Sequence, residues 1–222
     1  MLIFMIITAY FVIGYLCIYV FFPEKKPDIA TYFKPGQVFR SEAEGAVQTI
    51  LRQEGGIVYC SAVLEPYAPG PPKHYHSDFE ETFAIANGEL SFWIDGQVKK
   101  IRPGQKIHVP KGVPHKPYNE TGESIVVAGE VAFPEKFAFY LCQVYGIIDR
   151  DPSIVRSPRM ALQMSLLQQA GFNATLVEAP PVFIQHLSSF VLAPLARLMG
   201  YRSYYKEFDP KLETQNSAVL AV

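Results

Sequence analysis

The sequence predicts a mainly β protein that begins with a transmembrane helix and ends with a helical extension. Three observations support this prediction. The first 22 residues carry no charged side chain, short strand-like runs separated by Gly and Pro fill residues 36–132, and helical spacing follows from residue 133. A length of 222 residues suits one domain of ordinary size with additional segments at both ends.

Residues 1–22 are predicted to form an uncleaved membrane anchor, because about 20 apolar residues let a helix cross the hydrocarbon core of a bilayer. A cleaved signal peptide would need a basic start and a small-x-small cleavage site. This start has no Lys or Arg, and Phe21, Phe22 and Pro23 fill the expected cleavage zone. Lys25 and Lys26 open a linker over 23–35, so the positive-inside rule favours a single-pass protein with its folded domain on the cytoplasmic side.

Residues 36–132 are predicted to form the β domain. Asp95-Gly96 between two apolar runs indicates a hairpin, because a type I′ turn needs positive φ at both central residues. Closely spaced strands with turn residues between them are typical of a sandwich or small barrel. The expected strands are Val47–Leu51, Ile57–Leu64, Thr82–Ala86, Glu89–Ile94, Gln97–Ile101, Lys106–Val109 and Ser124–Val131.

Residues 133–206 are predicted to be helical, with helices over Glu135–Ile148 and Pro158–Ala170 and a third over 181–199. The apolar face of the third helix fits two arrangements. The helix could lie on the membrane surface with Arg197, Arg202 and Lys206 at the headgroups, or it could pack on the outside of the β domain. Residues 207–222 are expected to form a loose tail.

Charge and cysteine content exclude several classes of function. The net charge is −1 from 20 basic and 21 acidic side chains without a basic patch, so nucleic acid is excluded as a partner. Cys17, Cys60 and Cys142 are odd in number and far apart, which rules out a disulfide framework and a cysteine zinc site. The expected partners are a small molecule and the lipid bilayer, and the sequence allows a homodimer.

The first of two segments with candidate metal ligands contains His74 and His76. Two residues apart on an extended strand, their imidazoles point to the same face. Glu81 follows and shares a strand face with the bulky Phe83, so it is expected to point inward with the histidines. Glu80 is then expected to face outward.

The second segment supplies a further histidine. Ile107 and Val109 are expected to face inward, so His108 between them should point away, and His115 follows a turn. Three neutral imidazoles and one carboxylate that converge on one point make a site for a divalent metal. The predicted metal ligands are therefore His74, His76, Glu81 and His115.

These two segments resemble the two motifs of the cupin family over roughly Tyr59–Val131. The second has the family's spacing at Gly104, Pro110, Gly112, His115 and Asn119, and the first has it at His74, His76, Glu81 and Gly88. One departure is Ala68, which stands where the motif expects Gly. It puts the path of that loop in doubt, but no metal ligand. The resemblance implies a double-stranded β-helix (jelly-roll) barrel over 36–132 with the metal inside its mouth.

Four protein ligands leave one or two positions open on a metal that accepts five or six. Fe(II) or Mn(II) suits this ligand set best, and Ni(II) or Zn(II) is also allowed. The resemblance implies several reaction types, so we expect a metal-dependent enzyme of the dioxygenase or isomerase type acting on a small oxygenated molecule. The alternatives are a non-catalytic module that binds or senses a small ligand, and an assembly partner in a membrane complex. No catalytic residue beyond the ligands is identified.

Overall fold

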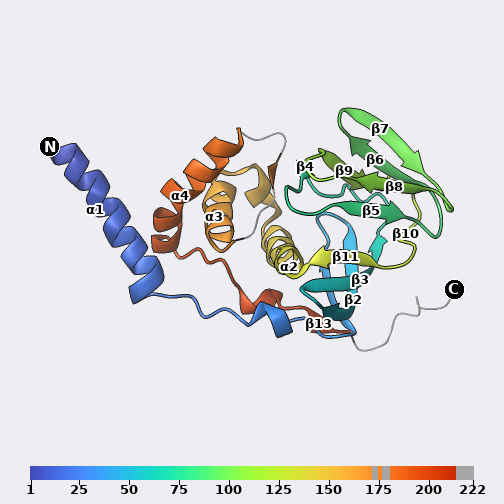
Figure 1. Cartoon of the computed structure of the whole chain (residues 1–222), viewed down its shortest axis with the longest axis horizontal. Coiled ribbons are helices and arrows are strands. Elements are labelled where there is room, and N and C mark those ends of the chain that lie inside the picture. Colours follow the sequence, from blue (N-terminus) through green and yellow to red (C-terminus); the bar gives the residue numbers. More distant parts are fainter. Residues whose placement is uncertain (172–174, 177–180, 214–222) are drawn as a thin grey trace.

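The computed structural model describes residues 1–171, 175–176 and 181–213. Its helices are α1 (Leu2–Leu16), α2 (Glu135–Arg150), α3 (Pro158–Gln169) and α4 (Val182–Leu198), with short helical turns η1 (Cys17–Phe21), η2 (Ile29–Thr31), η3 (Pro152–Arg156) and η4 (Lys206–Phe208). Its strands are β1 (Gln37–Ser41), β2 (Ala46–Glu54), β3 (Ile57–Leu64), β4 (His74–Tyr75), β5 (Glu81–Ala84), β6 (Leu90–Ile94), β7 (Gln97–Ile101), β8 (Lys106–Val109), β9 (His115–Tyr118), β10 (Ile125–Val126), β11 (Val131–Pro134), β12 (Thr175–Leu176) and β13 (Lys211–Leu212). The strands gather on one side of the molecule, α2, α3 and α4 lie on the other, and α1 projects away (Figure 1).

The largest sheet has six antiparallel strands in the order β10-β3-β2-β1-β13, with β11 also paired to β3. Strand β13 comes from the segment that the sequence predicted as a loose tail. Lys211 and Leu212 instead pair with Val38 and Gln37, and residues 214–222 lie outside the described residues. The expected strand over Ser124–Val131 is divided into β10 and the start of β11, because Gly129 adopts a positive φ of 78° between them.

The other strands form a five-stranded sheet, β12-β4-β9-β6-β7, and the two-stranded sheet β5-β8. The predicted Asp95-Gly96 hairpin joins β6 to β7, and both turn residues have positive φ. Among the described residues, these sheets do not join into a single closed barrel. A separate apolar cluster fills the space between them, with Phe92, Leu90 and Ile125 fully buried.

Helix α2 joins the β domain to the helical part. It buries Ala138, Phe139 and Ile147 in the main core together with Phe39, Ile50 and other residues of the six-stranded sheet. Helix α2 ends before Asp151-Pro152, where the proline is incompatible with continuing the helix. Helix α3 begins at Pro158 after the N-cap Ser157, whose hydroxyl accepts a hydrogen bond from the Arg159 amide.

Helix α4 packs against α3 through small residues and exposes its large ones. Ser189, Ala193 and Ala196 are buried. The exposed apolar side chains, with fractions from 37% to 68%, are Val182, Phe183, Ile184, Leu187, Phe190, Val191, Leu195, Leu198 and Met199. A helix on a water-soluble domain usually has the opposite distribution. The helix therefore presents an apolar face that the protein itself covers only in part.

Helix α4 also crosses the C-terminal half of α1. The Tyr10 and Tyr15 hydroxyls donate to the carbonyls of Val191 and Phe190 at 2.6 and 2.7 Å, and the Phe11 ring stacks on that of Phe190 at 5.0 Å. Gly14 packs so closely on Pro194 that an added Cβ would come within 2.4 Å of the proline ring. Leu2–Phe21, which comprises α1 and η1, is one helical stretch long and apolar enough to span a membrane.

Candidate metal centre

Strand register brings the two motif segments together. His74 on β4 pairs with His115 on β9, and Glu81 on β5 pairs with Val109 on β8. The Gly112 amide, in the turn before β9, donates to the His76 carbonyl at 2.7 Å. Antiparallel pairing sets these positions opposite each other although 41 residues separate His74 from His115.

All four predicted ligands meet at one point. One ligand atom from each of His74, His76, Glu81 and His115 can be chosen so that all lie within 4.8 Å of one another. This spread is close to the separation of about 4 Å expected between opposite donors around one metal ion. The three histidines are buried, and the Glu81 side chain is only 8% exposed. The residues could therefore hold a metal ion.

Backbone carbonyls fix the orientation of two imidazole rings. His74 Nδ1 lies 2.8 Å from the Pro72 carbonyl oxygen, and His115 Nδ1 lies 3.0 Å from that of Val113. A carbonyl can only accept, so each Nδ1 carries a proton and donates it. The His74 Nε2 lone pair is then free for a metal, and this arrangement is typical of metal-binding histidines.

His76 gives the clearest indication that this site fits a metal ion. Both of its ring nitrogens are buried and lack a hydrogen-bond partner among the described residues, and its Nε2 lies 3.5 Å from the Glu81 carboxylate. A buried polar atom without a partner is unfavourable by about 1–3 kcal/mol. A metal ion at the centre would be a partner for one of these two nitrogens, so the residues present fit a divalent metal.

The protonation states also suit metal binding. Burial, together with the neighbouring His115 and His76, lowers the pKa of His74 to about 4, so this ring is neutral at pH 7. Burial alone would raise the pKa of Glu81, but the hydrogen bond from His115 and the nearby His76 imidazole outweigh it and lower that pKa below the usual range. Burial lowers the pKa of His115, and the Glu81 carboxylate, 2.8 Å from its Nε2, reverses this effect and raises the pKa. A bound cation would replace the proton between these two groups.

The residues expected to point away from the centre do so. His108 and Glu80 have half-exposed side chains and pair with each other at 2.9 Å. The Thr82 hydroxyl oxygen lies 3.1 Å from His108 Nδ1. The alternation along β5 and β8 therefore separates Glu81 from Glu80 as the sequence predicted.

Two other motif positions shape the loops around the centre. The Asn119 side chain is buried and donates to the carbonyls of Glu65 and Glu123 at 2.8 and 2.7 Å, so it ties two loops together. In the loop with the departure from the motif, Ala68 is buried and Gly70 adopts a φ of 66°. A Cβ on Gly70 would lie 1.9 Å from the Pro117 carbonyl oxygen, so only glycine fits there.

Sequence reasoning missed the aromatic cover of the centre. The Phe79 ring stacks on His76 at 4.1 Å, and the Phe137 ring of α2 meets His76 edge-on at 4.7 Å. Helix α2 lies outside the family motifs, and the position of Phe137 in a helical pattern is that of an ordinary core residue. No signal in the sequence distinguished Phe137 from such a residue.

Comparison with known proteins identifies the family of the β domain. Residues 61–131 match the model of the cupin domain family. A segment of 42 residues is 40% identical to quercetin 2,3-dioxygenase of Bacillus subtilis (strain 168), covering 19% of this chain and 12% of that protein. A segment of 55 residues is 31% identical to an uncharacterized protein of Aquifex aeolicus (strain VF5), covering 25% of this chain and 46% of the relative. The chain thus spans less than half the length of either relative.

Solved structures with a similar arrangement include two named enzymes. The polyketide cyclase RemF from Streptomyces resistomycificus is 19% identical with a TM-score of 0.36, over 50% of this chain and 80% of that chain. A sugar phosphate isomerase of the cupin superfamily from Silicibacter pomeroyi is 21% identical with a TM-score of 0.36, over 49% and 74%. The resemblance predicted from the two motifs is confirmed by the family match: residues 61–131 of this chain are a cupin domain.

Proposed function

We propose that this protein is a membrane-anchored, metal-dependent enzyme of the dioxygenase or isomerase type that acts on a small oxygenated molecule. The single observation that carries the proposal is the convergence of His74, His76, Glu81 and His115, with both nitrogens of His76 buried and without a partner. Fe(II) or Mn(II) suits three imidazoles and one carboxylate best, and Ni(II) or Zn(II) is allowed.

The chain's own residues would orient the ligands and exclude water. A divalent metal held there supplies Lewis-acid chemistry, which polarises an oxygen of the substrate. The carbonyls of Pro72 and Val113 fix two rings, and Phe79 and Phe137 cover His76. The short 40% identity to quercetin 2,3-dioxygenase supports testing oxygen insertion first.

The test uses the full chain in lipid nanodiscs, loaded with Fe(II) or Mn(II). Oxygen uptake is measured with an electrode against a panel that begins with flavonols, and isomerisation of sugar phosphates is followed by NMR. We expect turnover of at least one compound by the loaded protein and none by His76→Ala, because that variant lacks a ligand. A protein that holds its metal but is inert across the panel, while a small molecule binds saturably, would instead favour the non-catalytic module.

The proposed location is a bilayer that α1 spans once, with the cupin domain on the cytoplasmic side. Lys25 and Lys26 after the span support this side. The large apolar residues on α4 support a second contact of this helix with lipid, beside α1. We also propose that the sheets of the cupin domain together make the jelly-roll barrel typical of the family.

A further inference from the structure

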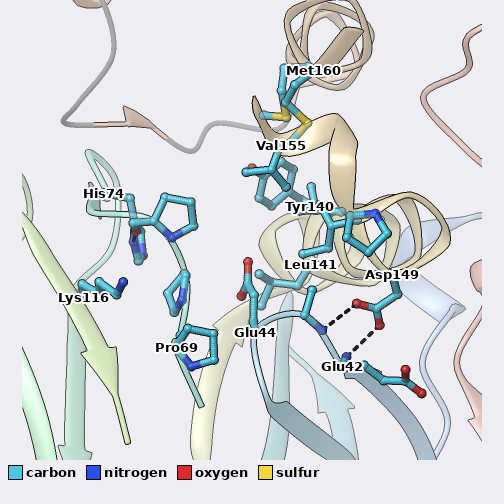
Figure 2. Close-up of a pocket in the computed structure, with 18 of the residues that line it drawn as sticks. Glu42, Glu44, Pro69, His74, Lys116, Tyr140, Leu141, Asp149, Val155 and Met160 are labelled. Carbon is cyan, nitrogen blue, oxygen red and sulfur yellow. Dashed lines mark hydrogen bonds between the residues drawn. The ribbon is translucent and has the colours of Figure 1, made fainter. Parts of the chain in front are cut away.

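A cavity of about 990 Å³ separates the cupin domain from the helical part. One wall holds His74, Lys116 and the loop of residues 69–72, and the opposite wall comes from α2, η3 and α3 (Figure 2). Figure 2 shows Tyr140, Leu141, Val155 and Met160 facing His74 across this space. The volume lies at the upper end of the range of small-molecule sites.

The helical wall is mostly apolar and adaptable. Its lining side chains include Leu141, Val144, Ile148, Met160 and Met164. Methionine has a flexible, polarisable side chain that fits ligands of different shapes. These side chains suit the hydrocarbon or aromatic body of a ligand.

Two polar groups on the cavity wall lack the usual partners. Glu44 is 7% exposed, and among the described residues no donor is paired with its carboxylate. The neighbouring carboxylate of Asp149, in contrast, accepts from the Ser41 hydroxyl and from the amides of Glu42 and Ala43 at 2.8–3.0 Å. In the described part of the chain Lys116 has no ion pair, and its ammonium lies 5.9 Å from the Tyr118 ring centre.

The cavity reaches the candidate metal centre. His74 lines it directly, and Phe137 both lines it and contacts His76. Lys116 follows His115 on β9 and belongs to the same wall as His74. A ligand whose oxygen end lies beside His74 and Lys116 therefore has room for an apolar body along α2 and α3.

We infer that this cavity binds an amphipathic organic acid, with its acidic oxygen group at Lys116, on the wall that also holds His74, and its apolar body against α2, η3 and α3. That this ligand is the substrate rests on the proposed function, whereas its binding in the cavity does not. Glu44 also lines the cavity and offers a hydrogen-bonding group to a ligand oxygen. Burial, reinforced by Asp149 and opposed by Lys116, raises the pKa of Glu44 to about 7, so near neutrality it carries a proton in much of the population and can donate.

The test is a calorimetric titration of 2-naphthoate into the metal-free full chain in nanodiscs, with empty nanodiscs as the blank. We expect one saturable site and weaker binding of the neutral analogue 2-naphthalenemethanol. Lys116→Met should weaken the binding of 2-naphthoate about tenfold, because a hydrogen bond to a charged group is lost. The matched control is Lys99→Met, which removes an exposed lysine on β7 and should leave the affinity unchanged.

Two further substitutions test whether the apolar body of the ligand lies against the helical wall. Met164→Trp and Val155→Trp both fill the cavity from the helical wall and should abolish binding, whereas Val98→Trp on the exposed face of β7 should not. Because two positions are used, the result can still be interpreted if one variant fails to fold. Arg156 also lines the cavity from η3. Comparing Arg156→Gln with Lys116→Met therefore shows which of the two cations binds the acidic group.

The absence of saturable binding would overturn the inference. So would binding that survives both tryptophan substitutions, or that depends on Arg156 and is unaffected by Lys116→Met. Because the titration is done without metal, its outcome is independent of the metal content on which the proposed function rests. If the protein binds 2-naphthoate but no metal, this inference stands and the proposed function fails.

Discussion

The cavity has two walls of different origin. The cupin wall offers the His74 imidazole and the Lys116 ammonium, and antiparallel pairing of β4 with β9 brings these two residues together. The helical wall offers mostly apolar side chains from elements outside residues 61–131, where the family model ends. We propose that the chemistry is carried by the cupin domain and that the helices added to it select the ligand.

The helical part itself contains a second contrast. Helix α2 buries large side chains such as Phe139 and Ile147, whereas α4 buries small ones and exposes Phe183 and Leu198. Both helices were predicted from apolar spacing, which identifies a face but does not say what covers it. The apolar face of α2 is covered by the six-stranded sheet. For the apolar face of α4, we propose that lipid covers it.

The largest effect is expected from removing a ligand on the cupin wall. His76→Ala should reduce bound metal from about one ion per chain to nearly none, because a three-ligand remnant holds a divalent ion far more weakly. His108→Ala, at an exposed histidine, should keep the metal. Elemental analysis of both purified variants decides this, and loss of metal in His108→Ala would mean that the assignment of inward and outward faces is wrong.

A second large effect concerns α4. A fluorescent NBD label on Leu187→Cys should be strongly quenched by brominated lipids in proteoliposomes, because position 187 lies on the exposed apolar face. A label on Val98→Cys, equally exposed but on the cupin domain, should not be quenched. The background carries Cys17→Ser, since Cys60 and Cys142 are buried. Equal quenching at the two positions would contradict the proposed contact between α4 and lipid.

The next effect is a pH dependence of stability at Glu44. Its pKa is about 7 in the folded protein and about 4.5 as an ordinary glutamate, so the folded state binds more protons between these pH values. The free energy of unfolding therefore falls as pH rises through this window. Glu44→Gln should gain on the order of 3 kcal/mol relative to the unmodified protein between pH 5 and pH 8.

Unfolding by denaturant at the two pH values checks this prediction for Glu44. The control is Glu123→Gln, at an exposed carboxyl, which should follow the unmodified protein at both pH values. If Glu44→Gln shows no gain at pH 8, the Glu44 carboxylate has a partner or water that the folded structure does not reveal.

The smallest effect is expected at Asp149, which joins α2 to the turn that bears Glu44. Asp149→Ala removes three accepted hydrogen bonds, and we expect a loss of about 2 kcal/mol in the free energy of unfolding. Asp149→Asn keeps one acceptor oxygen and should lose less. Denaturant unfolding measures both, and an equal loss would assign the effect to charge instead of hydrogen bonding.

Local sequence signals predicted the elements that depend on neighbouring residues. The strands at Ile57–Leu64, Gln97–Ile101 and Lys106–Val109 match the structure residue for residue, because alternation and turn residues fix them. The convergence of the four candidate ligands was also predictable, because the spacing of the motifs reflects strand register.

Features that depend on distant pairing could not be predicted. Strand β13 exists only because Lys211 and Leu212 meet β1 across most of the chain. Glu44 and Phe137 take part in the cavity because the turn before β2 and helix α2 are brought together by the tertiary fold. Neither residue belongs to a motif, and a glutamate in a turn or a phenylalanine in a helix has no special pattern.

The central claim is that three imidazoles and one carboxylate bind a single metal. X-ray absorption at the manganese K-edge of the Mn(II)-loaded full chain tests this most directly, because outer-shell scattering counts coordinated imidazoles. The account predicts three imidazoles in a shell made only of nitrogen and oxygen, and two in the His76→Ala protein if any metal is retained at high Mn(II) concentration. A shell with one imidazole or none, or with a sulfur ligand, would contradict it.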